Sequence, residues 1–62
     1  MMYSHEQIER MLLSNDPRVL VTGHRALADK LRQQYLEHPH PTYAKVIARL
    51  DADADRIERG FT

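Results

Sequence analysis

The amino-acid sequence predicts an all-α protein in which a short N-terminal helix precedes an antiparallel helical hairpin, with helices at about residues 4–13, 17–37 and 41–60. Helix-start signals stand before each segment, and apolar residues recur within each at helical spacing. Only residues 19–23 have a composition suited to a β-strand, and the sequence contains no second strand-like segment with which they could pair. We therefore expect one small helical domain, residues 1–62.

The first helix begins at the sequence SHEQ. Ser4 is a preferred N-cap residue, and Gln7 stands three residues later, where its side chain reaches back to the Ser4 amide. Apolar residues then follow at helical spacing from Ile8 to Leu12. The tetrapeptide SNDP ends this helix.

The second helix begins at Asp16, an N-cap residue, with Pro17 at the first helical position, where a missing N–H group costs nothing. One helical face carries Leu20, His24, Leu27, Leu31, Tyr35 and His38. We favour a continuous helix over 17–37, in which Gly23 costs about 1 kcal/mol relative to alanine. The alternative is a break at Thr22 and Gly23, because VLVTG is β-branched and closed by glycine.

The corner between the second and third helices is the sequence EHPHP. Pro39 removes an amide that the helix needs, and residues before proline avoid the α region, so His38 and His40 are expected to be extended. Pro41 is suited to start the third helix, and Gly60 to end it. Its apolar stripe is Tyr43, Val46, Ile47, Leu50, Ala54, Ile57 and Phe61.

The short corner makes the two long helices antiparallel. This pairing places the acidic DADAD, residues 51–55, opposite His24 and Arg25. It also places two basic residues of the third helix opposite two acids of the second: Lys45 and Arg49 opposite Asp29 and Glu37. Such exposed pairs select the orientation of the helices more than they stabilise them.

The composition limits the possible function. The chain has no cysteine, which excludes disulfides and thiolate zinc sites and fits a cytoplasmic protein. Its start lacks the pattern of a signal peptide, and no window approaches the length of a membrane span. Nine basic residues balance nine acidic ones, which argues against strong non-specific binding to nucleic acid and favours self-association.

The sequence gives little evidence for a metal site or for a catalytic group. His38 and His40, with Glu37, supply too few ligands, so we interpret them as a structural corner. DADAD opens like a calcium loop, but Arg56 and Thr62 occupy the positions that require glycine and glutamate. Both serines lie where caps and turns favour them, and no histidine is spaced for a triad. We expect no enzyme, no metal and no cofactor.

Two segments resemble a DNA-binding motif. ALADKL at 26–31 followed by TYAKVIARL at 42–50 resembles the two helices of a helix-turn-helix, and DRIERGF at 55–61 is similar to the end of a winged-helix regulator's recognition region. The resemblance implies that 42–50 is the recognition helix, with Thr42, Tyr43, Lys45 and Arg49 in the major groove and Arg32 on phosphate. Ten residues separate the two segments, where that family has a tight turn.

We favour a protein-interaction module of the adaptor, co-chaperone or inhibitor type, which binds a larger protein or forms a homodimer. Several apolar side chains lie partly off the face used inside the hairpin, which marks association: Leu13, Val19, Val21, Tyr35 and Leu36. The expected partner-binding residues are Leu27, Leu31, Tyr35, Tyr43, Ile47, Leu50, Ile57 and Phe61. The aromatic members of this set are the strongest anchor candidates.

Overall fold

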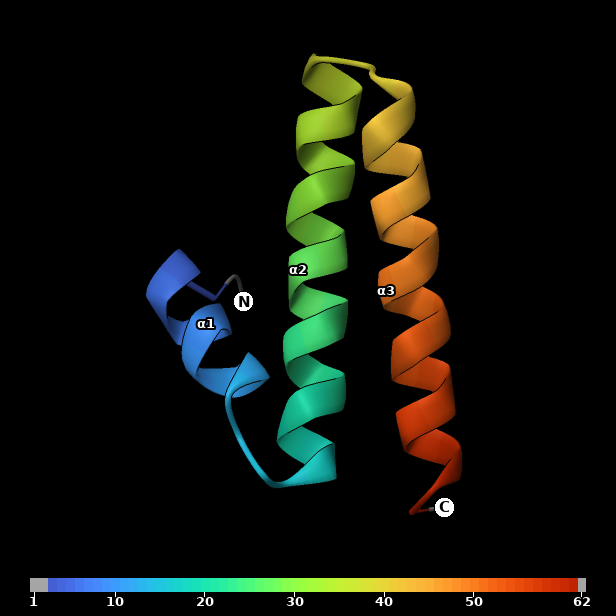
Figure 1. The fold of residues 1–62 in the computed structure, drawn as a ribbon. Helices are drawn as coiled ribbons and strands as arrows, with labels where there is room; N and C mark the ends of the chain where they lie inside the picture. Colours follow the sequence, from blue (N-terminus) through green and yellow to red (C-terminus); the bar gives the residue numbers. More distant parts are fainter. Residues whose placement is uncertain (1–2, 62) are drawn as a thin grey trace.

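The computed structural model describes residues 3–61 and contains three helices. They are α1 (His5–Leu12), α2 (Pro17–Glu37) and α3 (Pro41–Arg59). Helices α2 and α3 lie side by side and antiparallel, and α1 lies against the N-terminal half of α2 (Figure 1). The predicted all-α hairpin is confirmed, and each helix boundary falls within one residue of its expected position.

The helix starts form as the sequence predicts. The Gln7 amide donates to Ser4 Oγ at 3.2 Å, and the Ser4 amide donates to Gln7 Oε1 at 2.8 Å, which completes the capping box. Asp16 Oδ1 accepts from the Arg18 amide at 2.9 Å, with Pro17 at the first position of α2. Each cap satisfies a backbone donor that the helix itself leaves without a partner.

Gly23 lies inside α2, which is continuous, so the alternative break at this position does not occur. The glycine is buried because the last turn of α1 packs directly against it. A Cβ atom built at Gly23 would lie 2.8 Å from Met11 Cβ and 3.4 Å from Leu12 Cδ2. The glycine therefore weakens α2 locally but allows α1 to approach its backbone.

The hydrophobic core is very small. Among residues 3–61, the buried hydrophobic side chains are Ile8, Val21, Ala28 and Ala54. Ile8 anchors α1, and both alanines, each with no exposed surface, allow α2 and α3 to pack closely. The expectation that Val21 lies off the hairpin face is wrong, because positions 21, 25, 28 and 32 share the side of α2 that faces α3.

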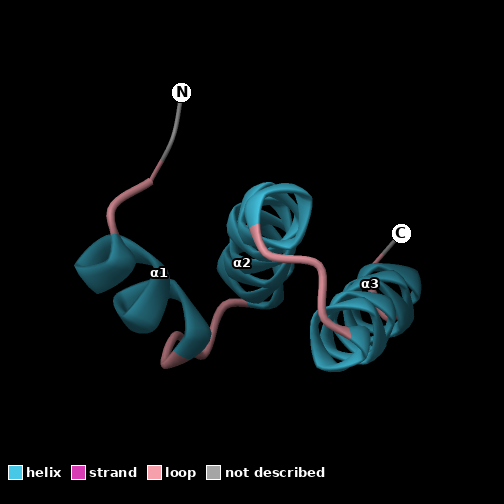
Figure 2. Ribbon diagram, turned by 90° about the horizontal axis from the view of Figure 1, so that it is seen from above, coloured by secondary structure: helices cyan, strands magenta, loops and turns pink. Residues whose placement is uncertain are grey.

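The three helices form an open arrangement. Viewed along α2, helices α1 and α3 flank it on either side (Figure 2). Within residues 3–61, α1 and α3 make no contact with each other. The radius of gyration is 11.8 Å, whereas a compact domain of this length has about 10.5 Å. Part of the α2 surface between the two flanking helices therefore has no covering element in this region of the chain.

Candidate interaction surface

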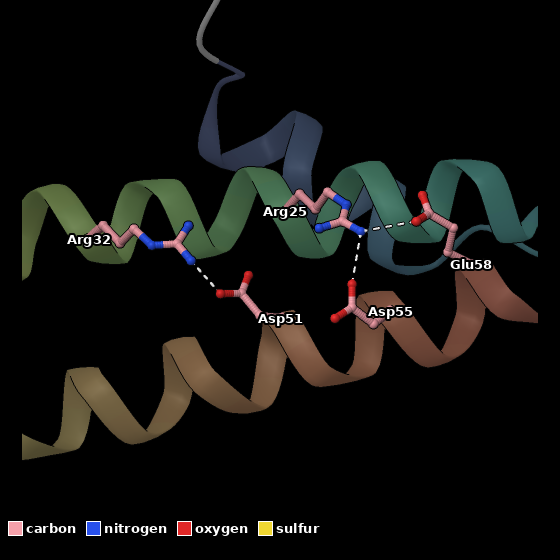
Figure 3. A network of polar contacts seen from close by, with 5 residues as sticks. All are labelled: Arg25, Arg32, Asp51, Asp55 and Glu58. Carbon is pink, nitrogen blue, oxygen red and sulfur yellow. Dashed lines mark hydrogen bonds and ion pairs between the residues drawn. The ribbon is translucent and has the colours of Figure 1, made fainter.

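Ion pairs define one edge of the contact between α2 and α3. One guanidinium nitrogen of Arg25 lies 3.2 Å from Asp55 Oδ1 and 3.4 Å from Glu58 Oε1, and Arg32 pairs with Asp51 (Figure 3). The expected placement of the acidic segment opposite Arg25 is therefore correct. These side chains are largely exposed, so each pair contributes well under about 1 kcal/mol. Together they select the antiparallel orientation and register.

The middle aspartate of DADAD, Asp53, has its partners elsewhere. Asp53 pairs within α3, at 2.7 Å from Arg56 and 3.4 Å from Arg49. Arg49 thus pairs inside its own helix, whereas the sequence suggested that it lies opposite acids of α2. All three aspartates of this segment are on a helix and each has an arginine partner, so they do not form the loop that calcium binding requires.

The opposite edge of the same contact is apolar. The side chains of Arg25 and Arg32 lie on the flank of α2 that also carries Thr22 and Asp29. Helical spacing places the leucines on the other flank. In α3 the same spacing separates the paired acids from the aliphatic residues. We call the resulting apolar surface the leucine face: Leu20, Leu31 and Tyr35 of α2 with Val46, Leu50 and Ile57 of α3.

The leucine face remains partly exposed. Tyr35 and Val46 retain 37% and 40% of their surface, and the other four residues are half-buried. His24 lies along the same flank, and its Nδ1–H donates to the Leu20 carbonyl at 2.7 Å. This bond satisfies one of the two ring nitrogens within α2. Since α1 reaches only the N-terminal half of α2 (Figure 1), the corner half of the face is the more open part.

Four of the eight residues expected to bind a partner come together on the leucine face: Leu31, Tyr35, Leu50 and Ile57. The other four lie nearby but are not part of it. Leu27 is half-buried at the margin of the face, on the same side of α2 as Leu20 and Leu31, and Tyr43 and Ile47 are half-buried within the hairpin stripe. Phe61 is exposed just beyond α3.

Sequence reasoning left Leu20 and Val46 out of the expected contact residues. The apolar pattern shows how wide the apolar stripe is on each helix. It does not show how each helix is rotated about its own axis relative to its neighbour. The pairing of Arg25 and Arg32 with acids four residues apart in α3 is the signal that fixes this rotation. With that edge known, both residues fall on the opposite, apolar side.

Two leucines are almost fully exposed and stand apart from the leucine face. Leu13 follows the end of α1, and Leu36 lies on the opposite flank of α2; they retain 83% and 81% of their surface. Their exposure confirms that apolar surface is left over outside the hairpin. Isolated exposed leucines are common on proteins, so neither one defines a site.

An open hollow of about 490 Å³ lies between α1 and the start of α2. Its lining is Tyr3, Gln7, Arg10, Met11, Arg18, Val19 and Thr22. Arg10 is paired with Glu6 at 3.1 Å, so its charge is partly neutralised. The lining contains no carboxylate, histidine or thiol that would support acid–base or metal chemistry.

The HPH corner is a helix start. His40 is the N-cap of α3, and its Nδ1 accepts from the Thr42 amide at 3.1 Å. Within residues 3–61, no group of three or more histidine, aspartate or glutamate side chains is close enough to hold a metal ion. The serines also have structural partners, since Ser4 caps α1 and Ser14 Oγ accepts from the Asp16 amide at 3.0 Å.

Replacing His40 by alanine should lower the free energy of unfolding by about 1 kcal/mol, because the Thr42 amide loses its acceptor. Replacing it by aspartate, a better N-cap, should retain or increase stability. His38→Ala is the matched control and should change stability by less than about 0.5 kcal/mol. Urea unfolding followed by circular dichroism measures all three variants, and equal losses for both alanine variants would contradict the capping role.

Comparisons with protein-family models, curated proteins and solved structures give no match. The function must therefore be inferred from the geometry itself. Among residues 3–61, no helix is both long enough and apolar enough to cross a membrane.

The arrangement of α2 and α3 differs from that of a helix-turn-helix. The helices of that motif cross at about 90–120°, whereas α3 packs antiparallel along α2 after a three-residue corner. Segment 26–31 is the middle of the continuous α2. Arg32 and Arg49, which the resemblance directs toward DNA, are paired with Asp51 and Asp53. DNA binding stays a prediction from the sequence alone.

Proposed function

We propose that the protein is a non-enzymatic interaction module that binds a protein partner through the leucine face. The supporting observation is the size of the core. Of the hydrophobic side chains in residues 3–61, only Ile8 and Val21 are both larger than alanine and buried. The leucines that would ordinarily complete the core are half-buried along one flank of the hairpin.

A core of this size leaves stability dependent on association. A chain of about 60 residues buries only about 60% of its unfolded surface, and this chain has no disulfide to compensate. Covering the leucine face would remove further apolar surface from water at about 25 cal/mol per Å². The proposed module therefore gains stability when its partner is bound, and we assign it to the cytoplasm, as the absence of cysteine suggests.

The chemistry of the face indicates the kind of partner it binds. Its six residues carry no charge, and the charged groups nearest to it are already ion-paired. A partner therefore needs a complementary apolar surface, such as the apolar side of an amphipathic helix. Tyr35, exposed at the open corner half, is the expected anchor.

Two adjacent substitutions test this proposal. Tyr35→Glu places a charge on the leucine face, whereas Leu36→Glu places the same charge one residue further along, on the opposite flank. Both positions are exposed, so both variants should keep their helical circular dichroism. Immobilised wild type and Leu36→Glu should retain the same protein from a cell lysate, with or without nuclease, and Tyr35→Glu should lose it.

Three outcomes would contradict the proposal. Retention by Tyr35→Glu together with loss by Leu36→Glu would move the binding surface to the other flank. Retention that disappears with nuclease would favour the helix-turn-helix interpretation, as would salt-dependent binding to heparin. No retained protein, in combination with a monomer at every concentration, would remove the interaction function altogether.

A further inference from the structure

We propose that the leucine face binds a second copy of this chain, so that two hairpins associate face to face. This inference rests on the proposed function, because it names the partner of the same surface. Three observations support a second copy over an unrelated partner: the area left uncovered, the charge of the chain and the geometry of the two long helices.

The chain exposes more surface than a typical monomer of its mass. The accessible surface is 4755 Å². Monomeric proteins of 7.3 kDa expose about 4,150 Å². The excess over the whole chain is about 600 Å². If two chains each buried this much, the interface would total about 1,200 Å², which is the lower limit of the range for stable specific interfaces.

The charge of the chain is also suited to self-association. The formal net charge is zero, so two copies do not repel each other. The charged residues that border the face on α3 are Arg49, Asp53 and Arg56, and they are ion-paired with one another within their own chain.

The two long helices present the face over most of their lengths. Helix α2 contributes positions from 20 to 35 and α3 positions from 46 to 57, and the helices have 21 and 19 residues. Two such hairpins with their apolar flanks together give four long helices around one shared core, which is a stable solution for helix packing. Each copy then supplies the apolar layer that the other lacks.

Molecular mass in solution tests the proposal directly. Analytical ultracentrifugation from about 1 µM to 1 mM covers the affinities expected for an interface of this size. Wild type and Leu36→Glu should approach twice the 7.3 kDa chain mass as concentration rises. Tyr35→Glu should weaken the dimer by about 30-fold or more, as expected for a charge placed at an interface anchor.

A second measurement does not depend on a charged substitution. Because the chain has no cysteine, Leu31→Cys introduces a single thiol on the leucine face, and Ala52→Cys introduces one on the exposed outer side of α3. The reaction of Leu31→Cys with a thiol reagent should slow as protein concentration rises through the dimer range. Ala52→Cys should react at the same rate throughout.

A mass that stays at 7.3 kDa up to 1 mM would overturn the second copy as the partner, as would concentration-independent reaction of Leu31→Cys. A dimer that Leu36→Glu dissociates and Tyr35→Glu does not would overturn the assigned face. The proposed function is tested by a different outcome from the one that tests the second copy. If the chain is monomeric but wild type and Leu36→Glu retain a protein that Tyr35→Glu loses, the interaction module stands and only the self-association is wrong.

Discussion

Replacing Ala54 by leucine should lower the free energy of unfolding by about 2–3 kcal/mol, because Ala54 has no exposed surface where α3 packs against α2. The larger side chain would force the two helices apart. Separation would also weaken the contacts of Val21 and Ala28, which belong to the same small core. For a domain of this size the melting temperature should fall by about 10–20 °C.

Ala52 provides the matched control for this prediction. It lies two residues earlier in the same helix and is exposed on the outer side. Alanine and leucine have similar helix propensities, so Ala52→Leu should change stability by less than about 0.5 kcal/mol. Thermal unfolding monitored by circular dichroism at 222 nm (a standard helix signal) compares the two variants, and equal melting temperatures would show that α2 and α3 do not pack through Ala54.

Replacing Gly23 by alanine should destabilise the protein by about 0.5–2 kcal/mol even though alanine is the better helix former. The substitution gains about 1 kcal/mol of helix propensity in α2. Against this, the new Cβ atom would lie 2.8 Å from Met11 Cβ, which belongs to the rigid part of that side chain. Helix α1 must therefore move outward, and exposing Ile8 costs about 1.5–3 kcal/mol.

A double-mutant cycle separates these two effects. Met11→Gly removes the atom that the new methyl group would meet, so in that background Gly23→Ala should become neutral or stabilising. Equal effects of Gly23→Ala in both backgrounds would show that the steric contact with α1 is absent. Unfolding by urea gives the four free energies.

Much of this fold is predictable because its helix boundaries depend on local chemistry. The capping box at Ser4, the Asp16–Pro17 start of α2 and the proline corner act within a few residues, and each forms as expected. Gly23 is harder to interpret, because its role depends on contacts with α1 that are distant in sequence. Its low propensity alone indicates a possible break, whereas the structure shows a packing site.

The proposed binding surface is only partly predictable, for a related reason. Helical spacing identifies apolar stripes, but a stripe wider than one contact does not reveal which part faces the neighbouring helix. Val21 is expected partly off the hairpin face, although it is buried, and Leu20 is absent from the expected contact residues, although it lies on the leucine face. The ion pairs of Arg25 and Arg32 resolve this rotation once their acidic partners are known.

The three-residue corner between α2 and α3 also has a consequence for the order of folding. Closing so short a loop costs little chain entropy, so the first contacts between the long helices form beside Pro39, among residues near in sequence. We expect pairing then to extend away from the corner, with the Arg32–Asp51 pair forming before the Arg25–Asp55 pair. The contact between α1 and Gly23 does not involve α3, so α1 can pack on α2 without waiting for that pairing. Because both contacts join helices that are neighbours in the chain, we expect the rapid folding kinetics of a protein whose contacts are mostly local.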